Sequence, residues 1–161
     1  MLKFTEQQIM LRDVAREFAQ KELEPKDRWM DENGFDWEVA KKITEAGFMG
    51  ANIPEEFGGG GGGFVDTTII AHEFAKASMS MAVFLGGHWL AANLILENGT
   101  DEQRAKYMPE AVAGKIFAFG LTEASAGSDA AGIKSVATET ETGWVLNGGK
   151  AWITNSGVAD R

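Results

Sequence analysis

The spacing of hydrophobic positions predicts that the chain begins with an amphipathic helix. Thr5, with Gln8 three residues later, forms a capping-box pattern that is typical of a helix start. Beyond it apolar residues recur at helical spacing until Pro25, where we expect this helix to end. The apolar positions of this helix are Met10, Leu11, Val14, Phe18 and Leu23. The helical pattern breaks again at residues 31–34, DENG.

A short second helix and a glycine-rich loop follow. Asp36 can cap a helix that ends near Gly47. The segment Ile53–Phe64, IPEEFGGGGGGF, holds six consecutive glycines, which neither a helix nor a central strand accommodates. Two interpretations of this loop stay open, a flexible tether and a functional loop. It lacks the Lys and the Ser or Thr of a phosphate-binding P-loop, so we do not expect a nucleotide cradle there.

Two strongly apolar segments predict the central helices of a helical domain. Residues 66–76 and 80–98 carry apolar side chains on nearly all sides. Helices of this kind are covered by neighbouring elements on most faces. A further helix over residues 100–114 opens with a second capping-box pattern and ends at a glycine.

The hydrophobic period changes from helical to strand-like near residue 116. The predicted strands lie within Ile116–Phe119, Ile133–Thr140, Trp144–Leu146 and Ala151–Thr154. The sequence Asn147-Gly148-Gly149 predicts a tight turn between the last two strands. The fold class is therefore predicted as α+β. An N-terminal all-α helical domain over residues 1–115 is followed by part of an all-β, barrel-like domain over residues 116–161.

Charge and composition narrow the classes of protein that fit. The net charge is −9, with 15 Lys and Arg against 24 Asp and Glu, which argues against a nucleic-acid-binding or anionic-membrane-binding surface. The chain has no cysteine, which excludes a disulfide scaffold, thiolate chemistry and Cys-ligated zinc. The N-terminus has no signal-peptide pattern and no window approaches about 18 continuous apolar residues. We therefore expect a cytoplasmic protein without a membrane span.

The histidines do not predict a site. His72 and His88 are the only two, and neither has a partner at metal-ligand spacing. We expect each to be an ordinary packed or surface residue, and we expect no metal site.

Residues 119–128 carry groups that suit a flat ligand bearing phosphates. An aromatic and small residues precede the hydroxyl of Thr122, and the turn at Gly127-Ser128-Asp129 offers amides and a hydroxyl that would bind a pyrophosphate. The alternative interpretation is a plain β-turn with a hydroxyl cap.

A second group of candidate ligand contacts follows about thirty residues later. Trp152 and Thr154 are two residues apart, so in a strand both side chains would face the same side. The indole would stack on a π system and the hydroxyl would bond a ring nitrogen. The alternative is a strand pair that packs a core. Because both groups of candidate contacts lie in one short β region, they together favour a flavin as the ligand.

Three motifs of the chain resemble those of the flavin-dependent acyl-CoA dehydrogenases, and the resemblance covers the whole chain. They are IPEEFGG at 53–59, GLTEASAGSDAAGIKS at 120–135 and LNGGKAWITN at 146–155. The family patterns are P-E-E-Y/F-G-G, L-T-E-P-x-A-G-S-D and L-N-G-x-K-x-W-I-T-N. The resemblance implies a helical domain, then a central β domain, and a C-terminal four-helix bundle that these 161 residues do not include. Ala124 and Ser125 depart from the family, which more often has Pro and Gly there.

The resemblance also implies FAD as the cofactor. Thr122 would bond the pyrimidine side of the isoalloxazine ring, and Trp152 would pack along that ring with Thr154 near its N5. Ser128 would hold the pyrophosphate and would also lie beside the acyl-CoA substrate. The implied cofactor-binding residues are Phe119, Leu121, Thr122, Gly127, Ser128, Trp152 and Thr154.

The reaction implied by the resemblance is α,β-desaturation of an acyl-CoA thioester. In the family a glutamate removes the α proton while a hydride passes from the β carbon to the flavin. That glutamate belongs to the C-terminal helical domain, so we assign no catalytic residue, and Glu55, Glu56 and Glu123 are not candidates. We expect the chain alone to be inactive or nearly so. The resemblance further implies electron-transfer flavoprotein as the partner and a full-length homotetramer or homodimer.

Two alternatives stay open. One is an acyl-CoA oxidase or flavin monooxygenase on the same scaffold, which would use oxygen. The other is a non-enzymatic, truncated helical module that acts through protein contacts and binds no flavin. The acyl chain length of a substrate does not follow from the residues.

Overall fold

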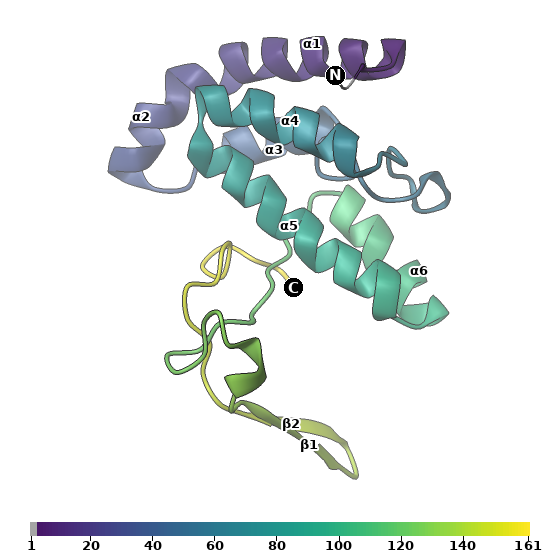
Figure 1. The fold of residues 1–161 in the computed structure, drawn as a ribbon, viewed down its shortest axis with the longest axis vertical. Coiled ribbons are helices and arrows are strands. Elements are labelled where there is room, and N and C mark those ends of the chain that lie inside the picture. Colours follow the sequence, from purple (N-terminus) through teal and green to yellow (C-terminus); the bar gives the residue numbers. More distant parts are fainter. Residues whose placement is uncertain (1–2) are drawn as a thin grey trace.

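The computed structural model describes residues 3–161 and shows a helical domain from which a β-hairpin projects (Figure 1). The α-helices, in chain order, are α1 (Glu6–Phe18), α2 (Glu24–Asn33), α3 (Trp37–Glu45), α4 (Phe64–Ala77), α5 (Met79–Asn98) and α6 (Asp101–Val112). A π-helical turn, Ala19–Leu23, joins α1 to α2, and 3-10 turns cover Glu55–Phe57 and Ala130–Gly132. The predicted fold class, a helical part followed by strands, is confirmed.

The first helix runs further than its sequence predicts. Thr5 and Gln8 form the expected capping box, but the helix does not end at Pro25. The π-turn carries the chain directly into α2, and Pro25 lies in the first turn of that helix. A proline is tolerated in the first turn of a helix, and a π-turn is one of the features that lets a helical chain bend at such a point. The chain leaves the helix only at Gly34, which has a φ of 93°.

The glycine run is an ordered turn and not a flexible tether. Each of its six amides donates a hydrogen bond, five to backbone carbonyls and that of Gly63 to the Asp66 carboxylate. The chain also passes close to itself, because a Cβ on Gly59 would lie 2.0 Å from the carbonyl oxygen of Ile53. The run is therefore folded against the segment that precedes it, and only a residue without a side chain fits at position 59.

The core of the helical domain forms around α5, which packs between α4 and α6 (Figure 1). Phe74 of α4 stacks with Phe18 and meets the edge of Phe48, with ring centroids 5.6 and 5.0 Å apart. By length and composition α5 could cross a membrane, with a mean hydropathy of 1.5 over 18 residues. It lies inside the helical domain instead, with eight buried residues, as core helices of this composition do. The expected cover on most faces is incomplete, because Met79, Val83 and Leu90 of α5 are exposed in residues 3–161.

The β region is smaller than its sequence predicts. β1 (Val136–Thr140) and β2 (Gly143–Asn147) pair antiparallel, with Thr138 opposite Val145, and form a single hairpin. Every residue of both strands is exposed, and Figure 1 shows the hairpin pointing away from the helices. Within the described residues no barrel forms.

Two of the four predicted strands, and the predicted turn, are wrong. The hairpin turns at residues 141–142, before β2, whereas Gly148 leads the chain out of the hairpin with a φ of 144°. Residues 116–119 are extended but pair with the last residues of the described chain: the amides of Asp160 and Arg161 both donate to the Ile116 carbonyl. Residues 151–154 contain a turn. β-type residues predict extended backbone, but ladder pairing depends on which segments lie beside them.

Candidate functional site

The segment that enters the predicted site is anchored on α5. The amide of Phe117 donates to Nδ1 of the buried His88 at 3.2 Å, and the two rings meet edge to face. Burial lowers the pKa of His88 to about 4, so the imidazole stays neutral and can accept this bond. The expectation that His88 is an ordinary packed residue is confirmed, and its structural role is to hold the start of the β region.

Asn155 fixes the second motif to the same place. Its side-chain amide donates to the carbonyls of Phe84 and Phe117, at 3.0 and 3.1 Å. Next to it Thr154 packs on Gly87 of α5, where an added Cβ would approach the Thr154 side chain to 2.8 Å. A glycine at position 87 therefore makes room for the second motif. The segments that carry the two motifs both contact α5 at this place.

The two motifs then run side by side. The amide of Ala151 donates to the carbonyl of Thr122 at 2.8 Å. At Gly120 an added Cβ would lie 3.3 Å from the Lys150 side chain and 3.8 Å from that of Ile153. Residues 120–122 and 150–153 thus form one continuous surface, although about thirty residues separate them in the sequence.

Trp152 does not lie in the strand that its sequence predicts. Its φ is 58°, in the left-handed region that a bulky residue rarely adopts, and its side chain is 93% exposed. Asn155 also has a positive φ, of 69°. Trp152 and Thr154 therefore do not alternate on a strand, and a turn orients each of them. Strained backbone with an exposed indole is typical of a residue that meets a ligand.

The other predicted cofactor residues occupy two environments. Leu121, Gly127 and Ser128 are exposed, and nothing lies within 4 Å of a Cβ built on Gly127. Phe119 is half-buried and packs against the core between α5 and α6, and Thr122 is also half-buried. The motif surface thus presents an exposed indole, an exposed apolar side chain and an open glycine backbone. These features fit a flat ring with a pyrophosphate, as in FAD.

A buried carboxylate, Glu123, joins the two motifs, at a residue for which the sequence predicts no role. Glu123 is only 7% exposed and accepts hydrogen bonds from the amides of Lys134 and Ser135 and from the Lys150 ammonium, at 2.7, 3.0 and 2.7 Å. The Lys150 ammonium, followed by these other donors, lowers the pKa of Glu123 to about 2. No local signal marks this pair, because the first motif also carries Asp129 and Lys134, and the sequence does not single out Glu123 as the partner of Lys150.

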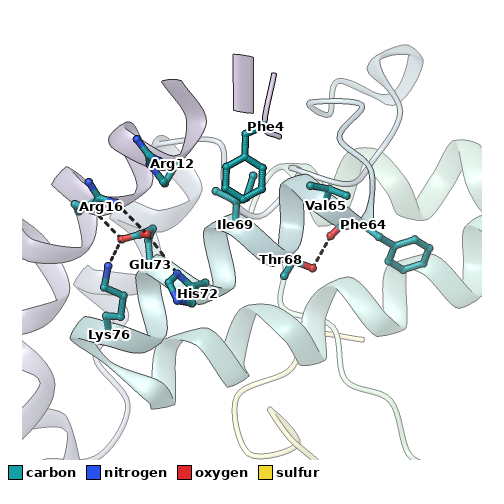
Figure 2. A pocket seen from close by; sticks show the side chains of 10 residues that line it. All are labelled: Phe4, Arg12, Arg16, Phe64, Val65, Thr68, Ile69, His72, Glu73 and Lys76. Atoms are coloured by element: carbon teal, nitrogen blue, oxygen red, sulfur yellow. Dashed lines mark hydrogen bonds and ion pairs between the residues drawn. The ribbon is translucent and has the colours of Figure 1, made fainter. Parts of the chain in front are cut away.

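A separate groove lies between α1 and α4 (Figure 2). It has a volume of about 630 Å³ and a mostly apolar lining. Figure 2 shows Arg16, His72 and Lys76 gathered around the Glu73 carboxylate at one end and Phe64 at the other. Hydrogen bonding to Arg16 is the largest of the causes that lower the pKa of Glu73 to about 2. None of the seven predicted cofactor residues lines this groove, and its ion pairs join α1 to α4.

Comparison with protein families matches both parts of the chain. Residues 5–115 match the family described as "Acyl-CoA dehydrogenase, N-terminal domain", and residues 118–161 match "Acyl-CoA dehydrogenase, middle domain". The fold and the paired motifs are thus those of a flavoprotein oxidoreductase. The chain belongs to the acyl-CoA dehydrogenase family, which confirms the resemblance found in its motifs.

Curated relatives match over nearly the whole chain. An acyl-CoA dehydrogenase of Bacillus subtilis is 37% identical over 97% of this chain and 42% of its own length. The acryloyl-CoA reductase (NADH) of Anaerotignum propionicum is 43% identical over 96% and 40%. A subunit of the caffeyl-CoA reductase–Etf complex of Acetobacterium woodii is 39% identical over 98% and 42%. The chain therefore spans about two fifths of the length of these relatives.

Solved structures agree with this assignment. Butyryl-CoA dehydrogenase of Megasphaera elsdenii matches with a TM-score of 0.90 and 35% identity, over 99% of this chain and 44% of that one. An acyl-CoA dehydrogenase of Bacillus anthracis, complexed with FAD, matches with a TM-score of 0.91 and 36% identity, over 98% and 28%. FAD is thus bound in the family.

Proposed function

We propose that this chain is the N-terminal portion of an FAD-dependent acyl-CoA dehydrogenase and supplies one wall of the flavin site. The observation that carries the proposal is the joined surface of the two motifs, where Trp152 is almost fully exposed beside the half-buried Thr122. In this proposal FAD supplies the acceptor for the hydride of the acyl β carbon. Leu121 and Trp152 cover the ring, Thr122 and Thr154 offer hydroxyls to it, and Gly127 and Ser128 bind the pyrophosphate.

A binding experiment with two tryptophan variants tests the cofactor assignment. Trp152 and Trp144 are both exposed, at 93% and 64%, but only Trp152 belongs to the proposed surface. FAD is titrated into the chain and followed by flavin absorbance and tryptophan fluorescence. We expect Trp152→Ala to weaken FAD binding by roughly fivefold to tenfold, the effect of one lost aromatic stack of about 1 kcal/mol. The matched variant Trp144→Ala leaves the affinity unchanged. Equal effects of both variants, or no binding at all, contradict the assignment.

We further propose that these 161 residues alone do not catalyse acyl-CoA dehydrogenation. Glu123 lies next to the flavin surface, but both its oxygens accept hydrogen bonds and its pKa is held near 2. Such a carboxylate is too weak a base to remove an α proton. Glu55 and Glu56 are exposed residues of the 3-10 turn before the glycine run, where neither was expected to act as the base. Acyl-CoA-dependent reduction of an artificial acceptor by the purified chain would contradict this part.

The electron partner of the whole protein is proposed to be electron-transfer flavoprotein. A relative belongs to a caffeyl-CoA reductase–Etf complex, which supports this partner. The same relative and the acryloyl-CoA reductase also favour a second candidate, the reverse reaction, in which an enoyl-CoA is reduced. Three assays of the full-length protein separate the candidates. The protein receives a saturated acyl-CoA with an electron acceptor, the same acyl-CoA with oxygen, or an enoyl-CoA with reduced Etf. The assay with the highest turnover rate identifies a dehydrogenase, an oxidase or a reductase, respectively.

Assembly and location complete the proposal. We expect the whole protein to be a homotetramer or homodimer, which light scattering of the full-length protein tests. We expect it in the cytoplasm, supported by the absence of cysteine, which suits a reducing compartment. Fractionation of the source cells checks the location, and recovery in another compartment contradicts it.

A further inference from the structure

Glu123 connects three separate stretches of the chain. Its Oε2 accepts from the amide of Lys134 at 2.7 Å, and its Oε1 accepts from the amide of Ser135 at 3.0 Å and from the Lys150 ammonium at 2.7 Å. The beginning of the first motif supplies the carboxylate, the last two residues of that motif, just before β1, supply two amides, and the second motif supplies the ammonium. A buried carboxylate is stable only with such partners, and charge-assisted bonds are the stronger kind.

Lys150 completes the connection from the other side. Its ammonium also donates to the carbonyl of Leu121 at 3.1 Å, so it holds the backbone of the first motif at two points. One residue further on, the amide of Ala151 bonds the carbonyl of Thr122. Because the ammonium is engaged within the protein and its side chain is only 29% exposed, Lys150 serves the chain itself rather than an external phosphate.

These contacts fix the parts of the surface that the proposed function needs. Leu121 and Thr122 lie one and two residues before Glu123, and Trp152 lies two residues after Lys150. The isolated bridge between Glu123 and Ala126 sets the turn that leads to Gly127 and Ser128. Little apolar burial supports this region, since Ala126 is the one buried hydrophobic residue beyond Phe117 in the described chain. Polar contacts must therefore hold it in shape.

We propose that Glu123 and Lys150 are positioning residues that lock the two cofactor motifs together before any flavin binds. This inference rests on the proposed function, because it assigns the locked surface to FAD. Neither side chain has to touch the flavin. Lys150 holds backbone of the first motif through the Leu121 carbonyl, and Glu123 holds the Lys150 side chain together with the amides of Lys134 and Ser135. Removing either side chain therefore loosens the contact between the two motifs.

Amide hydrogen exchange in the ligand-free chain, resolved by NMR, tests the lock directly. Lys150→Met in the second motif should speed exchange at Ala126 in the first motif by tenfold or more. Glu123→Gln should do the same at Ala151 in the second motif. The expected effect crosses between motifs, whereas a local packing role would change only the neighbourhood of the substituted residue. Unchanged exchange in the opposite motif overturns the proposal.

Matched controls separate the lock from loss of charge. Lys134→Met removes the same charge, but Lys134 contributes only its backbone amide to Glu123 and should leave exchange unchanged. Glu141→Gln in the exposed hairpin turn is the corresponding control for Glu123→Gln. Lys150→Arg keeps the charge and should restore exchange to within about threefold of the original rate. A Lys134→Met effect as large as that of Lys150→Met overturns the lock.

FAD titration then distinguishes the lock from the proposed function. If the unsubstituted chain binds FAD, Glu123→Gln and Lys150→Met should weaken binding by tenfold or more, and Lys150→Arg should restore it. Unchanged affinity in both variants overturns the positioning role even where exchange is faster. If the unsubstituted chain does not bind FAD, the proposed function of these residues fails, and the exchange result alone decides whether the lock exists.

Discussion

Residues 6–112 and residues 118–161 are held together by different kinds of interaction. The helical part buries most of the hydrophobic core, in two clusters around α5. Beyond Phe117 the described chain buries one hydrophobic residue, Ala126, and every residue of the hairpin is exposed. Phe119, Val158 and Ala159 pack half-buried against the helical core, and the rest of that part is held by polar contacts made by Glu123, Lys150, Asn155 and Asp160.

This difference explains why the two parts suit different tasks. Burial of apolar area is the dominant stabilising term in folding, so we expect the helical part to be the more stable of the two. A region held by hydrogen bonds gains less net free energy from each contact and keeps apolar side chains available. Trp152, Leu146 and Trp144 remain exposed there. Exposed side chains of this kind are typical of a surface that is covered by a ligand or by further protein.

The largest predicted effect concerns the stability of the helical part. Phe74 is fully buried and packs on Phe18 and Phe48. Phe74→Ala should lower the free energy of unfolding by about 3–5 kcal/mol, because it removes transfer free energy and leaves a cavity. Urea denaturation followed by circular dichroism measures the loss. Leu146→Ala in the exposed hairpin should stay within about 0.5 kcal/mol. Similar losses in both variants would break the contrast between the two parts.

The next prediction concerns pH at the junction of the two parts. The pKa of buried His88 falls from 6.5 to about 4 on folding, so between these values the unfolded chain binds a proton that the folded chain does not. Stability should therefore fall as the pH drops from 6.5 to 4, with roughly 3 kcal/mol of the loss due to His88. Glu73 and Glu123 add to the loss at the acidic end of this range, because folding lowers the pKa of each from 4.5 to about 2 and the unfolded carboxylates bind protons below about pH 5.

The variant His88→Gln checks this pH dependence by denaturation at several pH values. It should flatten the curve between pH 6.5 and about 5, above the range in which the carboxylates titrate. If the stability curve of His88→Gln keeps its slope, groups other than His88 cause the pH dependence.

A third prediction tests the polar attachment of the second part. Asn155→Gly keeps a residue that tolerates a φ of 69° but removes both hydrogen bonds to the carbonyls of Phe84 and Phe117. We expect a local loss of about 1–3 kcal/mol, because buried carbonyls lose their partner. Faster amide exchange at Ala118 should report it while the α4 amides stay protected. Asn98→Ala, which removes an exposed bond within α5, should leave Ala118 unchanged.

The smallest predicted effect compares two neighbouring glycines of α5. Gly86 has nothing within 4 Å of an added Cβ, whereas at Gly87 the Cβ would meet Thr154 at 2.8 Å. Gly86→Ala should raise the free energy of unfolding by up to about 1 kcal/mol, because alanine has the higher helix propensity. In Gly87→Ala a steric cost of about 1 kcal/mol or more should cancel that gain. Equal stabilisation of both variants, measured by thermal denaturation, would mean that Thr154 does not pack on α5.

Much of the helical part followed from local sequence signals. The capping boxes at Thr5 and Thr100 and the cap at Asp36 are present as predicted. Pro25 was the exception, because a π-turn before it lets the helix continue. In the second part the family resemblance gave the seven candidate residues, and two of them had the wrong backbone: Trp152 and Thr154 lie around a turn rather than on a strand. Their role in binding FAD stays a prediction.

The sequence by itself determined the helical platform, the family and the candidate cofactor, because helix caps, hydrophobic spacing and short motifs are local properties. Only the tertiary structure brought Thr122 beside Ala151 and gave Glu123 its partners at Lys134, Ser135 and Lys150. Those contacts join segments 11 to 29 residues apart. No local pattern encodes which distant amide or ammonium will meet a carboxylate; the path of the chain over α5 decides it.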